Sequence, residues 1–262
     1  MAVAARDVAL VTGASSGIGF ELARLCAQSG MTVVMVADEP AIGDRARELA
    51  AQGADVIPVE ADLASRAGVD EALRRAPGPI RFLCANAGTG VGGAFIDEPF
   101  SDVVHVIETN VTGTLYLLHC VGRQMREQRE GRILITGSIA GETPAPFIAV
   151  YFASKAFIDN FAVAFANEMK DFGVSVTCLM PGLTDTAFFE RADLMDTNVG
   201  QSEGKADPAD VARTGFEAAL KGEVRVIHGL TNTVLVAASN FVPPTFAAST
   251  QRKITEPGSG EH

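Results

Sequence analysis

The sequence predicts an α/β fold, a doubly wound parallel β-sheet of about seven strands with helices on both faces. Short β-rich apolar runs alternate with helix-length segments along almost the whole chain, which predicts right-handed βαβ crossovers. Some runs, such as Ile133–Ile135, are continuously apolar, as is typical of parallel strands covered on both faces. The 262 residues, 47% of them hydrophobic, suit one large domain, so residues 1–262 are expected to form a single unit.

The same alternation places each element in turn. The expected strands are Val8–Thr12, Thr32–Ala37, Asp55–Glu60, Ile80–Ala85, Arg132–Thr136, Val174–Met180 and Glu223–His228. The expected helices are Gly17–Ser29, Ile42–Gln52, Ser65–Arg75, Phe100–Gln128, Tyr151–Phe172 and Pro208–Leu220. The pattern breaks after Pro181, where residues 182–206 are polar and irregular, so we expect a functional loop there. Residues 256–262 are expected to form a flexible tail.

Composition argues against several classes of function. The net charge of −11 repels phosphate backbones and anionic lipids, so binding to nucleic acid or to a membrane surface is disfavoured. No secretory signal is expected at the N-terminus, and no stretch approaches the ~20 apolar residues of a membrane span. The cysteines are far apart and indicate reduced thiols in a cytoplasmic protein, and the histidines lack metal-ligand spacing, so no metal site is expected. These residues are Cys26, Cys84, Cys120, Cys178, His105, His119, His228 and His262.

A glycine-rich turn joins the first expected strand to the first expected helix. Gly13 permits the tight turn, Gly17 lets the backbone approach a pyrophosphate, and Gly19 allows close packing of helix against strand. The helix N-terminus then offers free N–H groups to the phosphates. Because the turn lies between a strand and a helix, it predicts a Rossmann-type, NAD(P)-binding domain. The residues expected to hold the phosphates are Gly13, Ser15, Ser16, Gly17, Ile18 and Gly19.

Asp38, which follows the second expected strand, bears on the choice of cofactor. A carboxylate at this point can accept hydrogen bonds from both adenosine ribose hydroxyls and would repel a 2′-phosphate. No base lies beside it, the nearest being Arg45, so NAD is the expected cofactor and NADP the alternative. Asp38 could also be a solvated acid, or the N-cap of a helix that begins near Pro40.

With that turn in place, the chain resembles the short-chain dehydrogenase/reductase family over nearly its whole length. The family's markers occur in order, namely Asp62-Leu63, Asn86-Ala87-Gly88, Asn110, Ser138, Tyr151, Lys155 and Pro181-Gly182. The resemblance implies that Asp62 and Leu63 lie near the adenine and that the Asn86–Gly88 turn supports the sheet and the cofactor. It also implies that residues 181–186 hold the nicotinamide carboxamide, with Thr184 and Thr186 among the contacts.

Four of these residues suit carbonyl and alcohol chemistry. Hydride reduction of a carbonyl needs a proton donor at the oxygen and alcohol oxidation needs a base there, and Tyr151 can be either. Lys155, one helical turn later, is expected to lower the pKa of that phenol. Ser138 can hydrogen-bond the substrate oxygen. By resemblance, Lys155 also holds the nicotinamide ribose, and Asn110 kinks its helix and holds a water that relays protons.

Three segments are expected, by resemblance, to bound the substrate pocket, namely 139–142, 145–150 and 187–190. They are mostly apolar, with Phe147, Phe188 and Phe189 the largest members, and they contain no Lys or Arg. We therefore expect an apolar ketone or secondary alcohol as the small-molecule partner. The alternative is that these phenylalanines only pack a lid. Arg191 is the nearest cation.

Other functions and the assembly stay open. A nicotinamide-sensing scaffold without turnover, an NADP-dependent carbonyl reductase, and an epimerase or dehydratase with a tightly held cofactor are the alternatives. The resemblance implies a homodimer or homotetramer formed through Phe100–Gln128 and Tyr151–Phe172. In place of the family's Gly-rich ending, the chain has an apolar stretch over Thr231–Phe241 that is expected to be helical.

Overall fold

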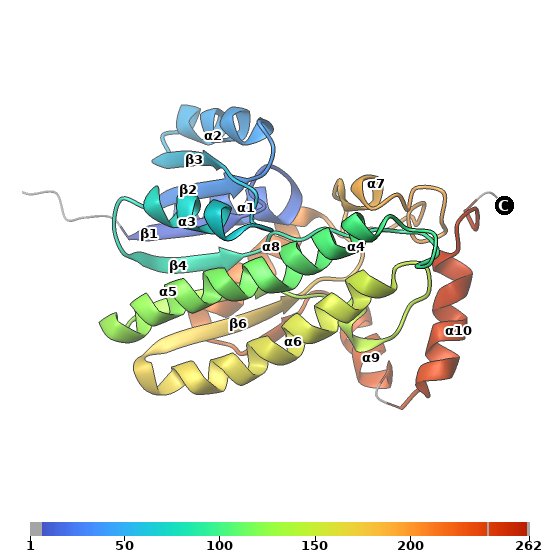
Figure 1. Ribbon diagram of the computed structural model, residues 1–262. Coiled ribbons are helices and arrows are strands. Elements are labelled where there is room, and N and C mark those ends of the chain that lie inside the picture. The colour runs from blue at the N-terminus through green and yellow to red at the C-terminus, as the bar shows by residue number, and fades with distance from the viewer. Residues whose placement is uncertain (1–6, 240, 261–262) are drawn as a thin grey trace, which may run out of the picture.

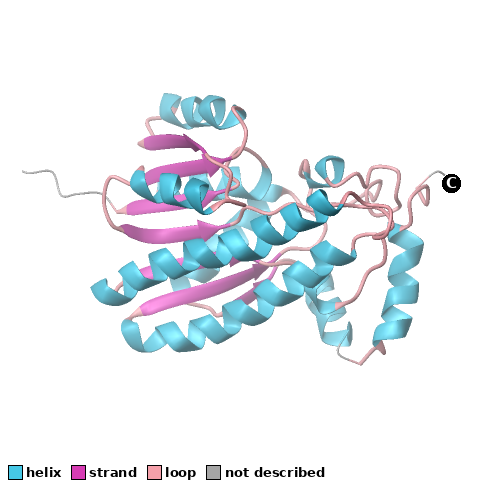
Figure 2. Cartoon of the chain, viewed as in Figure 1, coloured by secondary structure: helices cyan, strands magenta, loops and turns pink. Residues whose placement is uncertain are grey.

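Seven parallel strands form one sheet in the computed structural model, which describes residues 7–239 and 241–260 (Figures 1 and 2). Their order across the sheet is β3-β2-β1-β4-β5-β6-β7. The strands are β1 (Val8–Thr12), β2 (Thr32–Ala37), β3 (Val56–Glu60), β4 (Ile80–Ala85), β5 (Gly131–Thr136), β6 (Val174–Met180) and β7 (Arg225–Ile227). This confirms the predicted fold class, and the order reverses between β1 and β4, where such sheets bind ligands.

The strands are apolar because both faces of the sheet are covered. Every residue of β1 and of β2 is buried, and two separate core clusters lie on the two faces. The first face packs against α1 (Gly17–Gln28), α2 (Ala41–Ala51) and α8 (Pro208–Lys221). The second packs against α3 (Arg66–Arg74), α5 (Thr114–Gln128) and α6 (Ala149–Met169). Helix α2 begins at Ala41 with Pro40 as its N-cap, so Asp38 does not cap it.

The helix predicted over 100–128 has a wider turn within it. Helix α4 (Phe100–Ile107) passes into a π-helical segment, Glu108–Gly113, before α5 continues to Gln128. Gly113 is required here because a side chain at that position would collide with the carbonyl of Leu63. The π segment contains Asn110, and such segments are frequent at functional sites.

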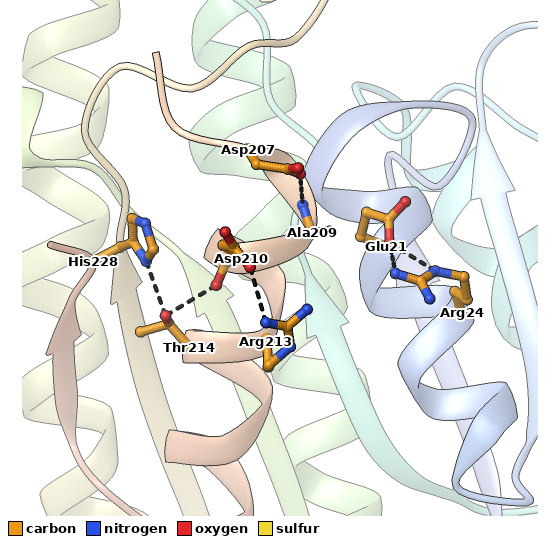
Figure 3. A network of polar contacts seen from close by, with 8 residues as sticks. All are labelled: Glu21, Arg24, Asp207, Ala209, Asp210, Arg213, Thr214 and His228. Carbon is orange, nitrogen blue, oxygen red and sulfur yellow. Dashed lines mark hydrogen bonds and ion pairs between the residues drawn. The ribbon is translucent and has the colours of Figure 1, made fainter. Parts of the chain in front are cut away.

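Helix α8 and strand β7 are tied together by polar side chains, as Figure 3 shows. Asp207 caps α8 by accepting a hydrogen bond from the Ala209 N–H at 2.7 Å. On the same helix, the Thr214 hydroxyl contacts His228 Nδ1 at 2.9 Å, just after β7 ends. His228 therefore has a structural contact that fixes the point from which the C-terminal helices depart.

The chain after β7 departs from the sequence-based expectation. The predicted helix is present as α9 (Leu230–Ser239), but a second helix, α10 (Pro244–Thr255), follows it and was not predicted. Figure 1 shows both beyond the carboxyl ends of the strands. Residues 256–260, expected to belong to a flexible tail, contact the 182–206 loop, because the N–H groups of Gly258 and Gly260 donate to Asp196 at 2.8 and 2.9 Å. Residues 261–262 lie outside the described part.

One helical stretch, Ala149–Phe172, is long and apolar enough to cross a membrane by length and composition alone, contrary to expectation. It comprises α6 and a short 3₁₀ turn, Lys170–Phe172, and it packs along β6 in the second core cluster. Within the described residues, no group of three or more His, Cys, Asp or Glu side chains is arranged to hold a metal ion. The four cysteines are free thiols.

Candidate active site

The glycine-rich turn has a backbone that side chains could not adopt or fit. Gly13 and Gly17 have φ values of 63° and 52°, in the left-handed region that favours glycine. A side chain at Gly19 would collide with the carbonyl oxygen of Gly13, so the helix can begin this close to the turn only with glycine. The turn is thus bare backbone at the N-terminus of α1, as a pyrophosphate requires.

Asn86 connects this turn to the middle of the sheet. Its amide donates to the Thr12 carbonyl at 3.1 Å, and its Oδ1 accepts from the Thr136 hydroxyl at 3.0 Å. The Thr12 hydroxyl in turn accepts from the N–H groups of Asn86 and Ala87 at 2.9 and 3.0 Å. These bonds hold the carboxyl ends of β1, β4 and β5 together at the reversal point.

The polar side chains around the turn form a network that the sequence did not predict. Ser15 donates to Glu39 Oε1 at 2.5 Å, and Arg191 forms an ion pair with that same oxygen at 3.0 Å. Arg191 also reaches the Ser16 hydroxyl at 3.3 Å. A cation from the loop after β6 therefore lies directly against the predicted phosphate site.

Six of the predicted cofactor residues lie outside the lining of the main cavity, three of them away from the glycine-rich turn. Asp38 is exposed after β2, while its neighbour Glu39 contacts the turn. Asp62 is exposed and accepts from the Ala64 N–H at 2.9 Å, which makes it the cap of a local turn. Leu63 is buried in the second core cluster. Ser15, Gly17 and Gly19 shape the turn from outside the cavity lining as well.

Tyr151 and Ser138 both line the main cavity, where their side chains are hydrogen-bonded to each other. The Ser138 Oγ accepts from the Ala140 N–H at 3.1 Å, which leaves its own hydrogen for the Tyr151 hydroxyl. Burial raises the pKa of Tyr151 to about 12, the hydrogen bond from Ser138 lowers it, and the charge of Asp159 raises it. The sequence predicts that Lys155 lowers this pKa; in the chain alone burial dominates, and the contact that lowers the pKa is the hydrogen bond from Ser138.

Lys155 and Asn110 lie on either side of Gly88. The Lys155 ammonium donates to the Thr136 carbonyl at 2.9 Å, 5.7 Å from the centre of the Tyr151 ring, and burial lowers its pKa. The Asn110 amide donates to the Thr89 carbonyl at 2.8 Å and to Ser154 at 2.9 Å. A Cβ on Gly88 would lie 3.4 Å from both Lys155 Nζ and Asn110 Oδ1, so Gly88 is next to both side chains.

The segment after β6 closes over the turn. The Ile139 N–H donates to the Pro181 carbonyl at 3.0 Å, and the Thr184 hydroxyl donates to the Gly182 carbonyl at 3.0 Å. Thr186 packs on Gly17, where any side chain would collide with it. The loop that follows returns to its own start, because the Ala206 N–H donates to the Leu183 carbonyl at 2.9 Å.

One cavity of about 580 Å³ joins these parts. Ser138 lines this cavity together with twelve of the predicted cofactor residues, namely Gly13, Ser16, Ile18, Asn86, Ala87, Gly88, Tyr151, Lys155, Pro181, Gly182, Thr184 and Thr186. Phe188 and Phe189 line it from helix α7 (Phe188–Arg191), and the Phe188 ring lies 4.7 Å from that of Tyr151. Phe147 does not line it; its ring lies under Arg252.

The residues fit a dinucleotide. The bare turn at the N-terminus of α1 suits a pyrophosphate, and Gly88, Tyr151 and Lys155 line the same cavity. The sequence did not reveal Glu39, Arg191 or the wall formed by α10, because each depends on contacts between distant parts of the chain. The acidity of Glu39, directly after Asp38, was the one local signal available.

Comparisons with known proteins agree with this geometry. The family model described as short chain dehydrogenase matches residues 7–196. A Myxococcus xanthus protein, described as an uncharacterized oxidoreductase, is 33% identical over 249 residues, 91% of this chain and 98% of its own. A short-chain dehydrogenase from Sphingobium yanoikuyae in complex with NADPH has a TM-score of 0.79 at 26% identity, covering 90% of this chain and 94% of that one. A Burkholderia phymatum homologue in complex with NAD has a TM-score of 0.79 at 25% identity, covering 91% and 96%.

Proposed function

Because the chain belongs to the short-chain dehydrogenase/reductase family of NAD(P)-dependent oxidoreductases, we propose that it transfers a hydride between NAD(H) and a hydrophobic ketone or secondary alcohol. The observation that carries this proposal is the meeting of the Tyr151 and Ser138 hydroxyls in a cavity that also contains the glycine turn. A proton donor, a hydrogen-bond donor and a dinucleotide site in one cavity are the parts that carbonyl reduction needs.

In this proposal the chain's own groups manage the substrate oxygen and its proton. Ser138 orients the carbonyl oxygen by donating a hydrogen bond, and Tyr151 donates the proton that converts the oxygen to a hydroxyl. In the oxidative direction Tyr151 accepts that proton. Lys155, bonded to the Thr136 carbonyl, supplies a positive charge beside the phenol, and Asn110 fixes the loop at Thr89. The bound nicotinamide supplies or accepts the hydride.

The residues proposed to hold the cofactor follow the cavity. The turn Gly13–Gly19 would bind the pyrophosphate, Asn86–Gly88 and Lys155 would flank the nicotinamide ribose, and residues 181–186 would hold the carboxamide. Asp38 would accept from the adenine ribose, with Asp62 and Leu63 near the adenine. We favour NAD because two carboxylates, Asp38 and Glu39, follow β2 and would repel a 2′-phosphate. NADP stays the second candidate because Arg191 lies against the same turn.

The assembly proposed is a homodimer or homotetramer through α5 and α6. Helix α6 carries a row of stacked rings, Phe157–Phe161–Phe165, with centroids 6.4 and 5.4 Å apart, and Phe157 is 45% exposed. Apolar area of this kind is what a second copy would cover. The free thiols support the proposal of a reducing, cytoplasmic location.

Fluorescence titration with NADH and with NADPH tests the proposed cofactor site. We expect saturable binding of both, with NADH tighter. Tighter binding of NADPH would make NADP the proposed cofactor, and Arg191 would then be the main candidate for recognising it. Absence of binding by either nucleotide would remove the basis for the proposed hydride transfer.

A further inference from the structure

The catalytic cavity extends from Tyr151 to the two C-terminal helices, and its far wall is one face of α10. The lining residues of α10 recur at the spacing of a single helical face: Phe246, Ala247, Thr250, Gln251, Ile254 and Thr255. Helix α9 contributes Leu235, Val236, Ala238 and Ser239. The cavity therefore has an arm between α9, α10 and the loop before α6, which we call the α9–α10 arm.

The polar side chains on the α10 face are already bonded to the protein. Gln251 Nε2 donates to the Thr143 hydroxyl at 3.4 Å, and the Thr255 hydroxyl donates to the Pro146 carbonyl at 2.9 Å. The Thr250 hydroxyl donates to the Phe246 carbonyl at 3.1 Å. The bonds of Gln251 and Thr255 attach α10 to the segment before α6, and the bond of Thr250 lies within α10. Mainly apolar surface is left facing the arm.

Charged groups around the cavity do not favour an ionic substrate. Its charged lining residues are Glu142, Lys155 and Arg191. The Lys155 ammonium is bonded to the Thr136 carbonyl and Arg191 is paired with Glu39 at the phosphate turn. Glu142 is paired with Arg225 and belongs to the 3₁₀ turn Ile139–Glu142, which contacts α9. A substrate anion in the arm would therefore find no unpaired cation among these lining residues, because each of the three charged groups is already bonded.

Two large apolar side chains line the cavity and are nevertheless exposed. Leu235 on α9 is 56% exposed and Phe246 on α10 is 66% exposed. Apolar surface that is open to water and continuous with a catalytic cavity is surface that an apolar ligand would cover. Resting on the proposed function, we propose that the α9–α10 arm binds the long apolar chain or ring system of a neutral ketone or secondary alcohol whose oxygen lies at Ser138 and Tyr151.

A homologous series of methyl ketones, from short to long, tests this with NADH or NADPH as reductant. We expect kcat/KM to rise by roughly threefold for each added methylene until the arm is filled. A ketone of the same length that ends in a carboxylate should be at least about tenfold poorer, because burying the carboxylate in the apolar arm without a partner cation is costly. A kcat/KM that does not change with length would overturn the proposal.

Matched variants place the effect in the arm. Leu235→Ser and Phe246→Ser should each lower kcat/KM for the longest ketones by about fivefold or more and leave the shortest ketone unchanged. Leu230→Ser is the control, because Leu230 is on α9 and 87% exposed but does not line the cavity. An equal loss in the Leu230→Ser variant would contradict the proposal. Turnover of short ketones without a length effect refutes only the arm, whereas no turnover with either nucleotide refutes the proposed function itself.

A second, independent observation concerns Asp159, one helical turn beyond Lys155 on α6. Its side chain is buried; Oδ1 accepts from the Ser138 N–H at 3.3 Å and from the Cys178 thiol at 3.5 Å. Oδ2 is buried without a hydrogen-bond partner among the described residues. Any side chain at Gly137 or Gly141 would collide with this carboxyl, so the Ser138 loop is wrapped on it.

The ionisable groups around Asp159 come from several elements. Lys155 lies on the same helix, Cys178 on β6, and Glu142 on the 3₁₀ turn, while Arg225 on β7 acts on Cys178. Burial raises the pKa of Asp159 to about 6, and the charge of Lys155 opposes that rise. The charge of Asp159 in turn raises the pKa of both Tyr151 and Lys155.

We infer that Asp159 is a positioning residue, which fixes Ser138 through its main-chain N–H and places a negative charge behind the Tyr151–Lys155 pair. It touches neither the substrate nor the cofactor in the proposed site. Asp159→Asn is the informative variant, because the amide oxygen can still accept the Ser138 N–H while the charge is lost.

The chain has only two tyrosines and no tryptophan, so the Tyr151 phenol can be titrated directly by absorbance in a Tyr116→Phe background. In that background Asp159→Asn should lower the pKa of Tyr151 by about half a unit or more. The pH profile of alcohol oxidation should move to lower pH in the same sense, with KM little changed. A purely structural role would lower thermal stability without moving either profile, and an unmoved phenol titration would overturn the inference.

Discussion

At the scale of single residues, burial dominates the electrostatics of the proposed catalytic groups. It raises the pKa of Tyr151 to about 12 and lowers that of Lys155, so each group is driven toward its neutral form. A protonated phenol at neutral pH is ready to donate a proton to a carbonyl oxygen. The free chain is therefore prepared for reduction, and oxidation requires the phenol to be made more acidic.

Asp159 should make the stability of the fold depend on pH, and the direction of the shift in its pKa decides the sign of that dependence. The pKa of its carboxyl rises from 3.8 to about 6 in the fold, so the folded state binds this proton more tightly than the unfolded chain. The resulting stabilisation is complete below the ordinary pKa and is lost as pH rises through about 6. Between about pH 4 and pH 7, the free energy of unfolding of wild type should fall by up to about 3 kcal/mol relative to that of Asp159→Asn. Urea unfolding of both proteins at the two pH values measures this difference. Equal changes in the free energy of unfolding of the two proteins would contradict the prediction.

Asp38 carries the proposed cofactor preference. Asp38→Ala should weaken NADH binding by about tenfold through loss of charged hydrogen bonds and should improve NADPH binding by removing a repulsive charge. Asp102→Ala, at an exposed carboxylate of α4, is the control for the change in net charge. If both nucleotides respond to Asp38→Ala no more than to the control, Glu39 is the residue to examine in its place.

At the scale of elements, the join between β1 and α1 depends on one close contact. Gly19→Ala would push a methyl group into the Gly13 carbonyl, so we expect NADH affinity to fall more than tenfold while circular dichroism stays nearly unchanged. Gly43→Ala in α2 is the matched control, because nothing lies within 4 Å of its added methyl. The Gly43→Ala variant should have a free energy of unfolding higher by up to about 1 kcal/mol, because alanine favours the helix more than glycine does. An intact NADH affinity in Gly19→Ala would contradict the proposed phosphate site.

The elements that the sequence predicted well are those whose pattern is local. The strand bounds agree within a residue or so except for β7, because buried parallel strands are continuously apolar and end at glycine or polar turns. Helix α10 was missed because Pro243 and Pro244 indicate the end of a helix, whereas here Pro244 occupies the first turn of the next one. The π segment and the packing of 256–260 on Asp196 depend on distant contacts that no local pattern carries.

The residues of the site likewise divide into those that a local sequence pattern predicts and those that depend on distant contacts. Twelve of the predicted cofactor residues line one cavity because they follow the carboxyl ends of neighbouring strands, which the fold class brings to one edge. Arg191 and Asp159 gain their positions from tertiary packing, so no local pattern of residues indicates their roles.

At the scale of the whole molecule, the sheet and the C-terminal helices have separate tasks. The sheet places the cofactor residues, and the 182–206 loop with α9 and α10 encloses the space in front of Tyr151. These outer parts are held to each other, since the Val199 N–H donates to the Ile254 carbonyl at 3.0 Å. Changes in substrate preference are therefore expected from the loop and the two helices rather than from the sheet.

The proposed assembly gives a prediction at this scale. Phe157→Asp would place a charge in the aromatic row of α6, so an oligomer formed through α5 and α6 should dissociate to monomers. Leu220→Asp, at a similarly exposed apolar residue of α8, should leave the assembly unchanged. Light scattering distinguishes the two, and dissociation by Leu220→Asp alone would locate the interface on the opposite face of the sheet.

The most direct test of the central claim is NADH oxidation with a lipophilic ketone, measured for wild type and for Tyr151→Phe after both have been titrated with NADH. We expect the two proteins to bind NADH with the same affinity, wild type to oxidise NADH only when ketone is present, and Tyr151→Phe to lose at least about a hundredfold in kcat. A Tyr151→Phe protein that turns over at nearly the wild-type rate would contradict the assignment of Tyr151 as the proton donor.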